Sequence, residues 1–184
     1  MQKQNNYRLI NRDESILVVI DVQEKLIPVI HDKDDVILNT ARLVRFCGIA
    51  GIPVIFTEQQ KLGITLPSVQ GSKEKFQAIE KIHFNCFLNP DFSEKVKIMG
   101  RNTLILTGVE SHICVAQTAI AALPDWNVHV VSDAVSSRSA ANRTIALQRM
   151  RDAGAVITST EMFIYEILIQ AGTDEFKYVL PLVK

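Results

Sequence analysis

The sequence predicts an α/β protein of three layers, in which one parallel β-sheet carries helices on both faces. Two observations lead to this prediction. Short, uninterrupted apolar runs alternate with longer segments of helical periodicity along the chain, and no repeat or low-complexity segment separates them. An uninterrupted apolar run is typical of a strand that is buried on both faces, as parallel sheets require. Regular alternation of strand and helix favours a single open sheet with right-handed crossovers.

The first expected strand covers residues 16–20, which are apolar, mostly β-branched and followed by Asp21. Apolar residues at helical spacing predict a helix over 34–50, which ends at Gly51. Further strands are expected at 54–56, 103–107, 128–131 and 155–157, and further helices at 110–123, 139–153 and 160–171. Between the second and third of these strands, the polar loop 59–75 is a candidate lid or pocket wall.

Composition indicates one soluble domain that covers residues 1–184. Lys+Arg and Asp+Glu each number 20, so the formal net charge is zero and offers no basic surface for nucleic acid or an anionic membrane. Neither a signal peptide nor an apolar run of about 18 residues is visible, and three dispersed cysteines suit a reducing compartment, so we expect a cytoplasmic protein. Zero net charge with a mean hydropathy of +0.13 favours self-association, and we expect a homo-oligomer.

Polar residues follow the expected strands at their carboxyl ends, where open parallel sheets bind ligands. Asp21 follows the first strand, Thr57 and Glu58 follow the second, and Asp133 follows the fourth. The third strand runs into the segment 108–115, which reads GVESHICV. No GxGxxG follows a strand and no GxxxxGK[ST] is present, so the nucleotide-binding functions of this architecture lose most of their support.

Cys114 is the strongest candidate nucleophile. It lies within the first turn or so of the helix expected after the third strand, where unpaired N–H groups and the helix dipole favour a thiolate. The same N–H groups can hold a developing oxyanion. A buried cysteine that only packs the helix against the sheet explains this segment equally well, so both interpretations stay open here.

Asp21 and Lys81 are the other candidates for chemistry. A carboxylate at the end of a buried apolar strand is costly unless it is paired or functional. Asp21 is therefore a candidate base for the thiol proton, with helix capping as the alternative. An ammonium beside it would keep the carboxylate ionised and favour a thiolate, and Lys81 is the candidate, although a lysine is a surface residue by default.

Together these segments resemble the isochorismatase-like cysteine hydrolase family. The likeness is carried by Asp21 in LVVIDVQ, by Lys81 in Lys-x-x-Phe and by Cys114 in GVESHICV. These elements occur in the order of the family, with gaps of 60 and 33 residues (81 − 21 and 114 − 81). The likeness runs over about residues 16–169, which is most of the chain.

The resemblance implies a six-stranded parallel sheet and an Asp–Lys–Cys triad. In that triad Cys114 is the nucleophile, Asp21 accepts and returns the proton, and Lys81 tunes both. The resemblance also implies a cis peptide bond after Val109, which would direct the amides of Glu110 and Cys114 at the oxyanion. The implied activity is hydrolysis of a carbonyl–nitrogen or related acyl bond in a small-molecule substrate, without an organic cofactor.

One departure from the family concerns metals. The nicotinamidase branch carries an Asp-x-His metal site after the second strand, where this chain reads FTEQQ over 56–60. Glu58 is a candidate ligand, but the nearest histidine in sequence is His83, and zinc or iron needs several converging ligands. We therefore expect no metal. Isochorismatases proper lack the nucleophilic cysteine, so Cys114 favours acyl-transfer chemistry over vinyl-ether hydrolysis.

Four residues near these motifs are expected to contact the substrate: Gln23, Glu58, Phe84 and His112. Cys86 is a rival nucleophile, although a role in lining the pocket or core fits it better.

The alternative to an enzyme is a non-catalytic interaction, scaffold or redox-sensing module that retains the fold.

Two polar residues of the second half receive structural interpretations. His129 alternates with apolar neighbours in a strand, which indicates a histidine with satisfied polar atoms, in the core or on a face of the sheet. Asp133 is interpreted as a helix cap rather than as a partner of Arg138.

Overall fold

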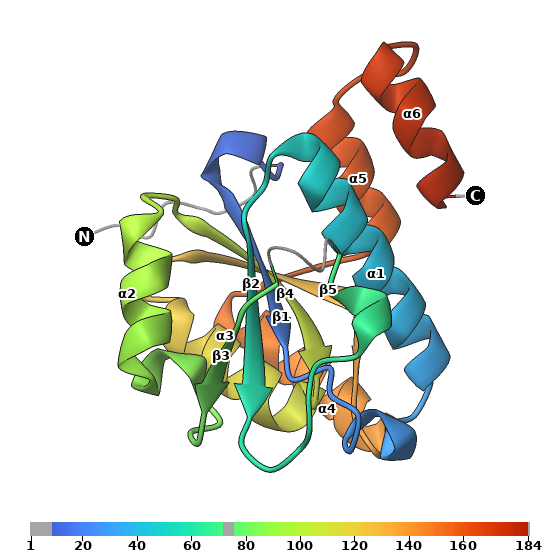
Figure 1. Cartoon of the computed structure of the whole chain (residues 1–184). Helices are drawn as coiled ribbons and strands as arrows, with labels where there is room; N and C mark the ends of the chain where they lie inside the picture. Colours follow the sequence, from blue (N-terminus) through green and yellow to red (C-terminus); the bar gives the residue numbers. More distant parts are fainter. Residues whose placement is uncertain (1–8, 72–75, 184) are drawn as a thin grey trace.

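A six-stranded parallel sheet forms the centre of the computed structural model, which describes residues 9–71 and 76–183. The strands lie in the order β3-β2-β1-β4-β5-β6 (Figure 1). Their bounds are Ser15–Ile20 for β1, Val54–Gln59 for β2, Ala78–Lys81 for β3, Thr103–Val109 for β4, Asn127–Ser136 for β5 and Val156–Thr158 for β6. The strand order reverses between β1 and β4, so their carboxyl ends lie side by side at the position where open α/β sheets bind ligands.

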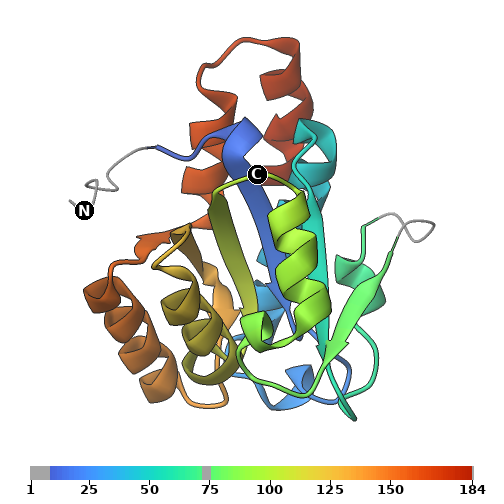
Figure 2. The same ribbon diagram turned by 90° about the vertical axis from the view of Figure 1, so that its left-hand side faces the viewer.

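Helices cover both faces of the sheet, which confirms the three-layer architecture. One layer contains α1 (Lys33–Ala50), α5 (Thr160–Leu168) and α6 (Asp174–Val183). The other layer contains α2 (Pro90–Ile98), α3 (Ala116–Ala122) and α4 (Ala140–Ala153), and it covers the face turned toward the viewer in Figure 2.

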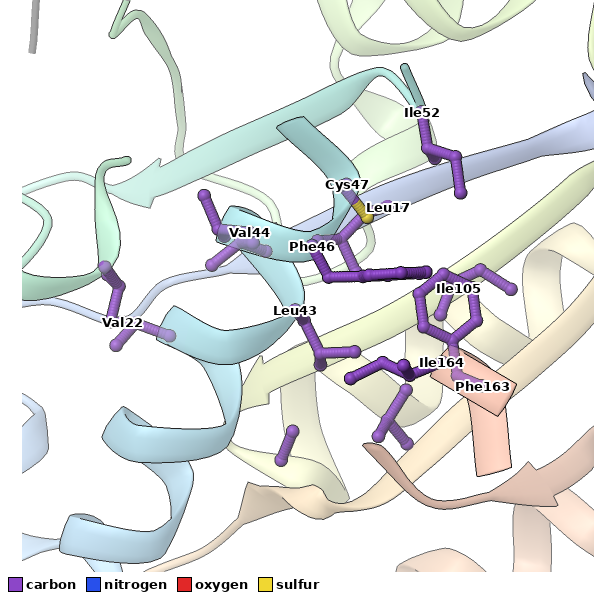
Figure 3. Close-up of a cluster of buried hydrophobic side chains, with 14 of the residues drawn as sticks. Leu17, Val22, Leu43, Val44, Phe46, Cys47, Ile52, Ile105, Phe163 and Ile164 are labelled. Atoms are coloured by element: carbon purple, nitrogen blue, oxygen red, sulfur yellow. The ribbon is translucent and has the colours of Figure 1, made fainter. Parts of the chain in front are cut away.

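Alternate residues of the central strands point into opposite layers. In β1, Leu17 packs in the cluster of α1 and α5, whereas Val18 packs in the cluster of α2, α3 and α4. Within the first cluster, Phe46 of α1 and Phe163 of α5 meet edge to face with ring centroids 5.7 Å apart (Figure 3). Burial on both faces explains why β1 is an uninterrupted apolar run.

The five strands predicted from apolar runs are all present, but β5 is longer than expected. It continues to Ser136, so Asp133 lies within the strand rather than beyond it. The Asp133 carboxylate accepts hydrogen bonds from the backbone N–H and the hydroxyl of Thr160, at 2.8 and 3.0 Å. Asp133 therefore caps the start of α5, as interpreted from the sequence.

Several helices differ from the expectation. The helix expected over 110–123 divides into a π-helical turn, Ser111–Val115, and the α-helix α3. The apolar periodicity had not indicated α2 or α6. The sequence did contain a start signal for α2, because the side chain of Asn89 accepts a hydrogen bond from the Phe92 N–H and Pro90 occupies the first turn.

Gly108 is required by the close approach of β4 to the end of β1. Its φ is +110°, and a Cβ at this position would lie 2.0 Å from the carbonyl oxygen of Ile20. No side chain fits there without movement of the backbone. This glycine allows the last residues of β4, and the turn that carries Cys114, to lie directly against Asp21 and the end of β1.

Candidate active site

Lys81 is the centre of a buried polar cluster at the carboxyl end of the sheet. It is the last residue of β3 and is 2% exposed. Its Nζ lies 2.7 Å from Asp21 Oδ2, 2.8 Å from Gln59 Oε1 and 3.7 Å from Cys114 Sγ. The three residues predicted as the triad, Asp21, Lys81 and Cys114, are far apart in the sequence and thus come together at the Lys81 ammonium.

The electrostatic surroundings keep this ammonium charged. Burial lowers the pKa of Lys81, but the charge and hydrogen bond of Asp21, together with the nearby acidic groups Cys114 and Cys86, raise it by more, so the pKa of Lys81 lies above its usual value. Lys81 is therefore a cation at neutral pH, and Asp21 is its buried counter-ion.

Asp21 is held at both carboxylate oxygens. The Thr57 hydroxyl donates to Oδ1 at 2.7 Å, and Lys81 Nζ donates to Oδ2 at 2.7 Å. The Asp21 backbone N–H also donates to the Thr57 carbonyl oxygen at 3.2 Å. Asp21 has a φ of 54°, in the left-handed region that a non-glycine residue adopts at a cost of about 1–2 kcal/mol. The end of β2 thus helps to fix a strained backbone and its carboxylate together.

Cys114 lies in the π-helical turn and is 6% exposed. The sequence had led us to expect a thiolate, but the structure favours the neutral thiol. Burial raises the pKa of Cys114, the negative charge of Asp21 raises it further, and the opposing effect of Lys81 is smaller. In the substrate-free protein the sulfur therefore keeps its proton, beside a carboxylate that is able to accept it.

Cys86 lies close to the same cluster but is fully buried. Its backbone N–H donates to the Thr118 hydroxyl at 3.0 Å. Burial raises the pKa of Cys86 to about 11, and the charge of Lys81 offsets only part of this effect. Cys114 retains 6% exposure and its Sγ lies 3.7 Å from Lys81 Nζ, whereas Cys86 is closed off from solvent, so Cys86 fits the alternative role of core residue.

The segment before Cys114 has the backbone geometry that the family resemblance implied. The peptide bond between Val109 and Glu110 is cis. The Glu110 side chain is 5% exposed, and its carboxylate accepts hydrogen bonds from the backbone N–H and the Nε of Arg138 at 2.8 and 3.2 Å. Arg138 therefore pairs with Glu110 and not with Asp133, and it ties the end of β5 to the turn that carries Cys114.

Gln23 and Glu58, both expected to contact substrate, form hydrogen bonds with residues of the segment 59–65 at and after the end of β2. Gln23 is buried, and its amide bonds the backbone N–H and carbonyl of Gln59 and the carbonyl of Gly63. Glu58 Oε1 accepts from the N–H and hydroxyl of Thr65 at 2.6 and 2.7 Å. The geometry favours roles in positioning this loop. Of the candidate lid 59–75, residues 72–75 lie outside the described residues.

Phe84 and His112 occupy different surroundings. Phe84 follows β3 and is 51% exposed, so its ring is available to a ligand. His112 Nδ1 lies 2.9 Å from the Ser137 hydroxyl, and its Nε2 lies 3.5 Å from Asn142 Nδ2. These contacts fit a wall residue better than the base of Cys114, while contact of either side chain with substrate stays a prediction.

Residues 56–60, where the nicotinamidase branch was expected to carry its metal site, make other contacts in this protein. Glu58 bonds Thr65, and the Gln59 amide turns toward Lys81. Within the described residues, no group of three or more His, Cys, Asp or Glu side chains is arranged to hold a metal ion. Thr57 and Gln59 were not predicted as site residues; the available signal was that they are polar and closely follow the apolar run 54–56.

A three-layer α/β protein with a buried Asp–Lys–Cys cluster at the switch point of its sheet belongs to the class of isochorismatase-like hydrolase folds. The comparison with known families gives the same answer, because residues 15–162 match the model of the isochorismatase domain. The chain therefore belongs to the isochorismatase family, and this membership supports a hydrolase role.

Similar proteins match over nearly the full length of the chain. Isochorismatase domain-containing protein 2 of Danio rerio is 36% identical over 173 residues, which cover 92% of this chain and 86% of the relative. The secreted isochorismatase effector Isc1 of Phytophthora sojae is 35% identical over 178 residues, with coverage of 92% and 84%. The structure of the MAR1 ribonuclease from Caenorhabditis elegans is 36% identical, with a TM-score of 0.88 and coverage of 96% and 92%.

No helix in the described part of the chain is long and apolar enough to span a membrane. Cytoplasmic localisation stays a prediction, and the Phytophthora relative is described as secreted.

Proposed function

We propose that this protein is a cysteine hydrolase that cleaves a carbonyl–nitrogen or related acyl bond of a small molecule. The observation that carries the proposal is the position of one buried ammonium, Lys81 Nζ, 2.7 Å from the Asp21 carboxylate and 3.7 Å from the Cys114 sulfur. A nucleophile, a base and a cation that orients both are the parts that covalent acyl transfer needs.

In the first half of the reaction, the Cys114 sulfur bonds to the carbonyl carbon of the substrate while its proton passes to Asp21. The carbonyl oxygen takes up the negative charge, which the backbone N–H groups of Glu110 and Cys114 stabilise. Asp21 then gives the proton to the leaving nitrogen as the carbon–nitrogen bond breaks. The amine departs and a thioester remains on Cys114.

In the second half, a water molecule attacks the thioester while Asp21 accepts one of its protons. The carbon–sulfur bond breaks, the acid is released, and the proton returns to the sulfur. Lys81 keeps its charge throughout, which stabilises whichever of Asp21 and Cys114 is negative. The raised pKa of the resting thiol supports this order of events, because the proton leaves sulfur only as the new bond forms.

The experiment is acid-quench mass spectrometry with a panel of small amides and activated esters, together with turnover assays. We expect acylation on the peptide that contains Cys114, and we expect Cys114→Ala to abolish both acylation and turnover. Cys47→Ala is the matched control, because Cys47 is a buried thiol in the opposite helix layer. Full turnover by Cys114→Ala would refute the proposal and favour the binding-module alternative.

The proposal includes a small-molecule substrate and an assembly of identical subunits, as expected from the neutral charge. Light scattering on purified protein tests the assembly, and a monomer at all concentrations would contradict it. Incubation with RNA tests the activity named for the C. elegans relative, and we expect no cleavage because the chain carries no excess of basic residues.

A further inference from the structure

Gln59 is the acceptor that completes the surroundings of the Lys81 ammonium. An ammonium group has three N–H donors, and a buried one needs an acceptor for each. Lys81 has three neighbours that can accept: Asp21 Oδ2 at 2.7 Å, Gln59 Oε1 at 2.8 Å and Cys114 Sγ at 3.7 Å. The two short contacts hold Nζ, and the sulfur is the third and longest.

The orientation of the Gln59 amide is fixed by its other contacts. Its Nε2 donates to the carbonyl oxygen of Ile82 at 2.9 Å, so Oε1 is the end that faces the ammonium. The Gln59 backbone is bonded at both its N–H and its carbonyl by the buried side chain of Gln23. The amide is thus held in place before any substrate arrives, which is how a positioning residue acts.

The end of β2 supplies one contact to each member of the ion pair. Thr57 and Gln59 are two residues apart in the strand and share a face. The Thr57 hydroxyl donates to Asp21 Oδ1, and the side-chain Oε1 of Gln59 accepts from Lys81 Nζ. A donor therefore meets the carboxylate and a neutral acceptor meets the ammonium, with no net charge added to the pair.

We propose that Gln59 is a positioning residue that holds the Lys81 ammonium beside Cys114 and, being neutral, leaves the positive charge available to the thiolate. A carboxylate at this position would bind Lys81 more strongly and would repel a negative sulfur. An apolar side chain would remove one acceptor and let the ammonium shift toward Asp21. This inference rests on the proposed role of Cys114 as nucleophile.

The test compares Gln59→Glu and Gln59→Met with Gln60→Glu and Gln60→Met. Gln60 is the next residue, has the same side chain and is exposed, so it is a matched control. Thermal unfolding first identifies the variants that fold. If Gln59→Glu does not fold, the comparison of Gln59→Met with Gln60→Met is a sufficient test. The readout is the pH profile of Cys114 alkylation by iodoacetamide, followed by peptide mass spectrometry.

We expect Gln59→Glu to slow alkylation at a given pH by about tenfold, which corresponds to a rise of about one unit in the pKa of Cys114. Gln59→Met should slow it by a smaller factor, and both Gln60 variants should match the wild type. If the Gln59 and Gln60 variants share one profile, the inference is wrong.

A second measurement separates this inference from the proposed function. This measurement compares crystal structures of the wild type and of Gln59→Met. In the variant we expect Lys81 Nζ to lie farther from Cys114 Sγ than in the wild type and to keep its contact with Asp21. An unchanged Nζ position would overturn the inference whatever the reactivity of Cys114. If Nζ moves but Cys114 is inert in the wild type, the positioning role stands and the proposed nucleophile is wrong.

Discussion

Thr57 and Lys81 each donate a hydrogen bond of 2.7 Å to a different oxygen of the Asp21 carboxylate. Thr57 reaches Oδ1 from β2, and Lys81 reaches Oδ2 from β3, so Asp21 is oriented by the two strands on one side of it. This arrangement places a fixed, buried carboxylate next to the Cys114 thiol, and it makes the Thr57 hydroxyl a structural requirement.

Thr57→Val should therefore destabilise the protein by about 1–3 kcal/mol, because it leaves a buried carboxylate oxygen without its donor. The measurement is urea unfolding followed by circular dichroism. Thr158→Val is the matched control, since Thr158 is another buried strand threonine, and its hydroxyl has no partner among the described residues. That substitution should be neutral or stabilising, and equal losses for both variants would contradict the prediction.

The Asp21–Lys81 pair should show strong coupling. Asp21→Asn leaves a buried ammonium without its counter-ion, and Lys81→Met leaves a buried carboxylate without its own; each should cost about 3–5 kcal/mol. The double variant removes both charges, so its loss should be clearly smaller than the sum of the two single losses. Urea unfolding of the four proteins gives the cycle, and simple additivity would mean that the pair is not a coupled unit.

Gly108→Ala should prevent correct folding or destabilise the protein severely. The new Cβ would lie 2.0 Å from the Ile20 carbonyl oxygen, at a φ of +110° that alanine avoids. Gly48→Ala is the control, because Gly48 lies in α1 and a Cβ there meets nothing within 4 Å. The control should gain about 0.5–1 kcal/mol of helix stability. Soluble, equally stable Gly108→Ala protein would show that β1 and β4 can separate at this point.

The sequence pattern located Asp21 and Cys114 because each follows a buried strand at the ligand-binding end of the sheet. Lys81 needed the family resemblance, since β3 is a four-residue edge strand without an apolar run. Thr57 and Gln59 depend on strand register, which pairs Thr57 with Ile20 of β1 and Gln59 with Lys81 of β3. Local pattern does not encode register between strands, so these two contacts could not be predicted.

The ionisation of Cys114 shows a second limit of prediction from sequence. A cysteine near a helix start suggests a thiolate, but how deeply it is buried and how near it lies to Asp21 follow only from the fold. Burial and the negative charge of Asp21 both raise the pKa of Cys114. In the same way, the pattern around His129 predicted its burial, but the prediction that its polar atoms are satisfied is wrong, because its buried Nδ1 has no partner among the described residues.

The raised pKa of Cys114 predicts slow alkylation of the substrate-free protein at neutral pH. The rate should keep rising with pH beyond about 8.5, where a free cysteine has reached its midpoint. Iodoacetamide labelling at a series of pH values, with peptide mapping, measures this profile. Asp21→Asn should lower the pKa and speed the reaction, because it removes the negative charge that opposes the thiolate. A plateau near pH 7 in the wild type would mean that Cys114 is a thiolate at rest.

His129 should make the protein less stable in acid. It is a buried residue of β5, and burial lowers its pKa from 6.5 to about 4. Between these values the unfolded chain binds a proton that the folded chain excludes, so the free energy of unfolding falls as the pH falls through this window. The full effect of a shift of this size is about 3 kcal/mol.

His129→Gln should remove this contribution and flatten the stability curve between pH 6.5 and 4, as measured by urea unfolding at each pH. His83→Gln is the control, because His83 is exposed and its replacement should leave the slope as in the wild type. The comparison of slopes is decisive even if His129→Gln lowers stability at every pH, since a packing defect shifts the whole curve and only loss of the titrating group changes its slope. An unchanged slope in His129→Gln would mean that the acid sensitivity arises from the carboxylates instead.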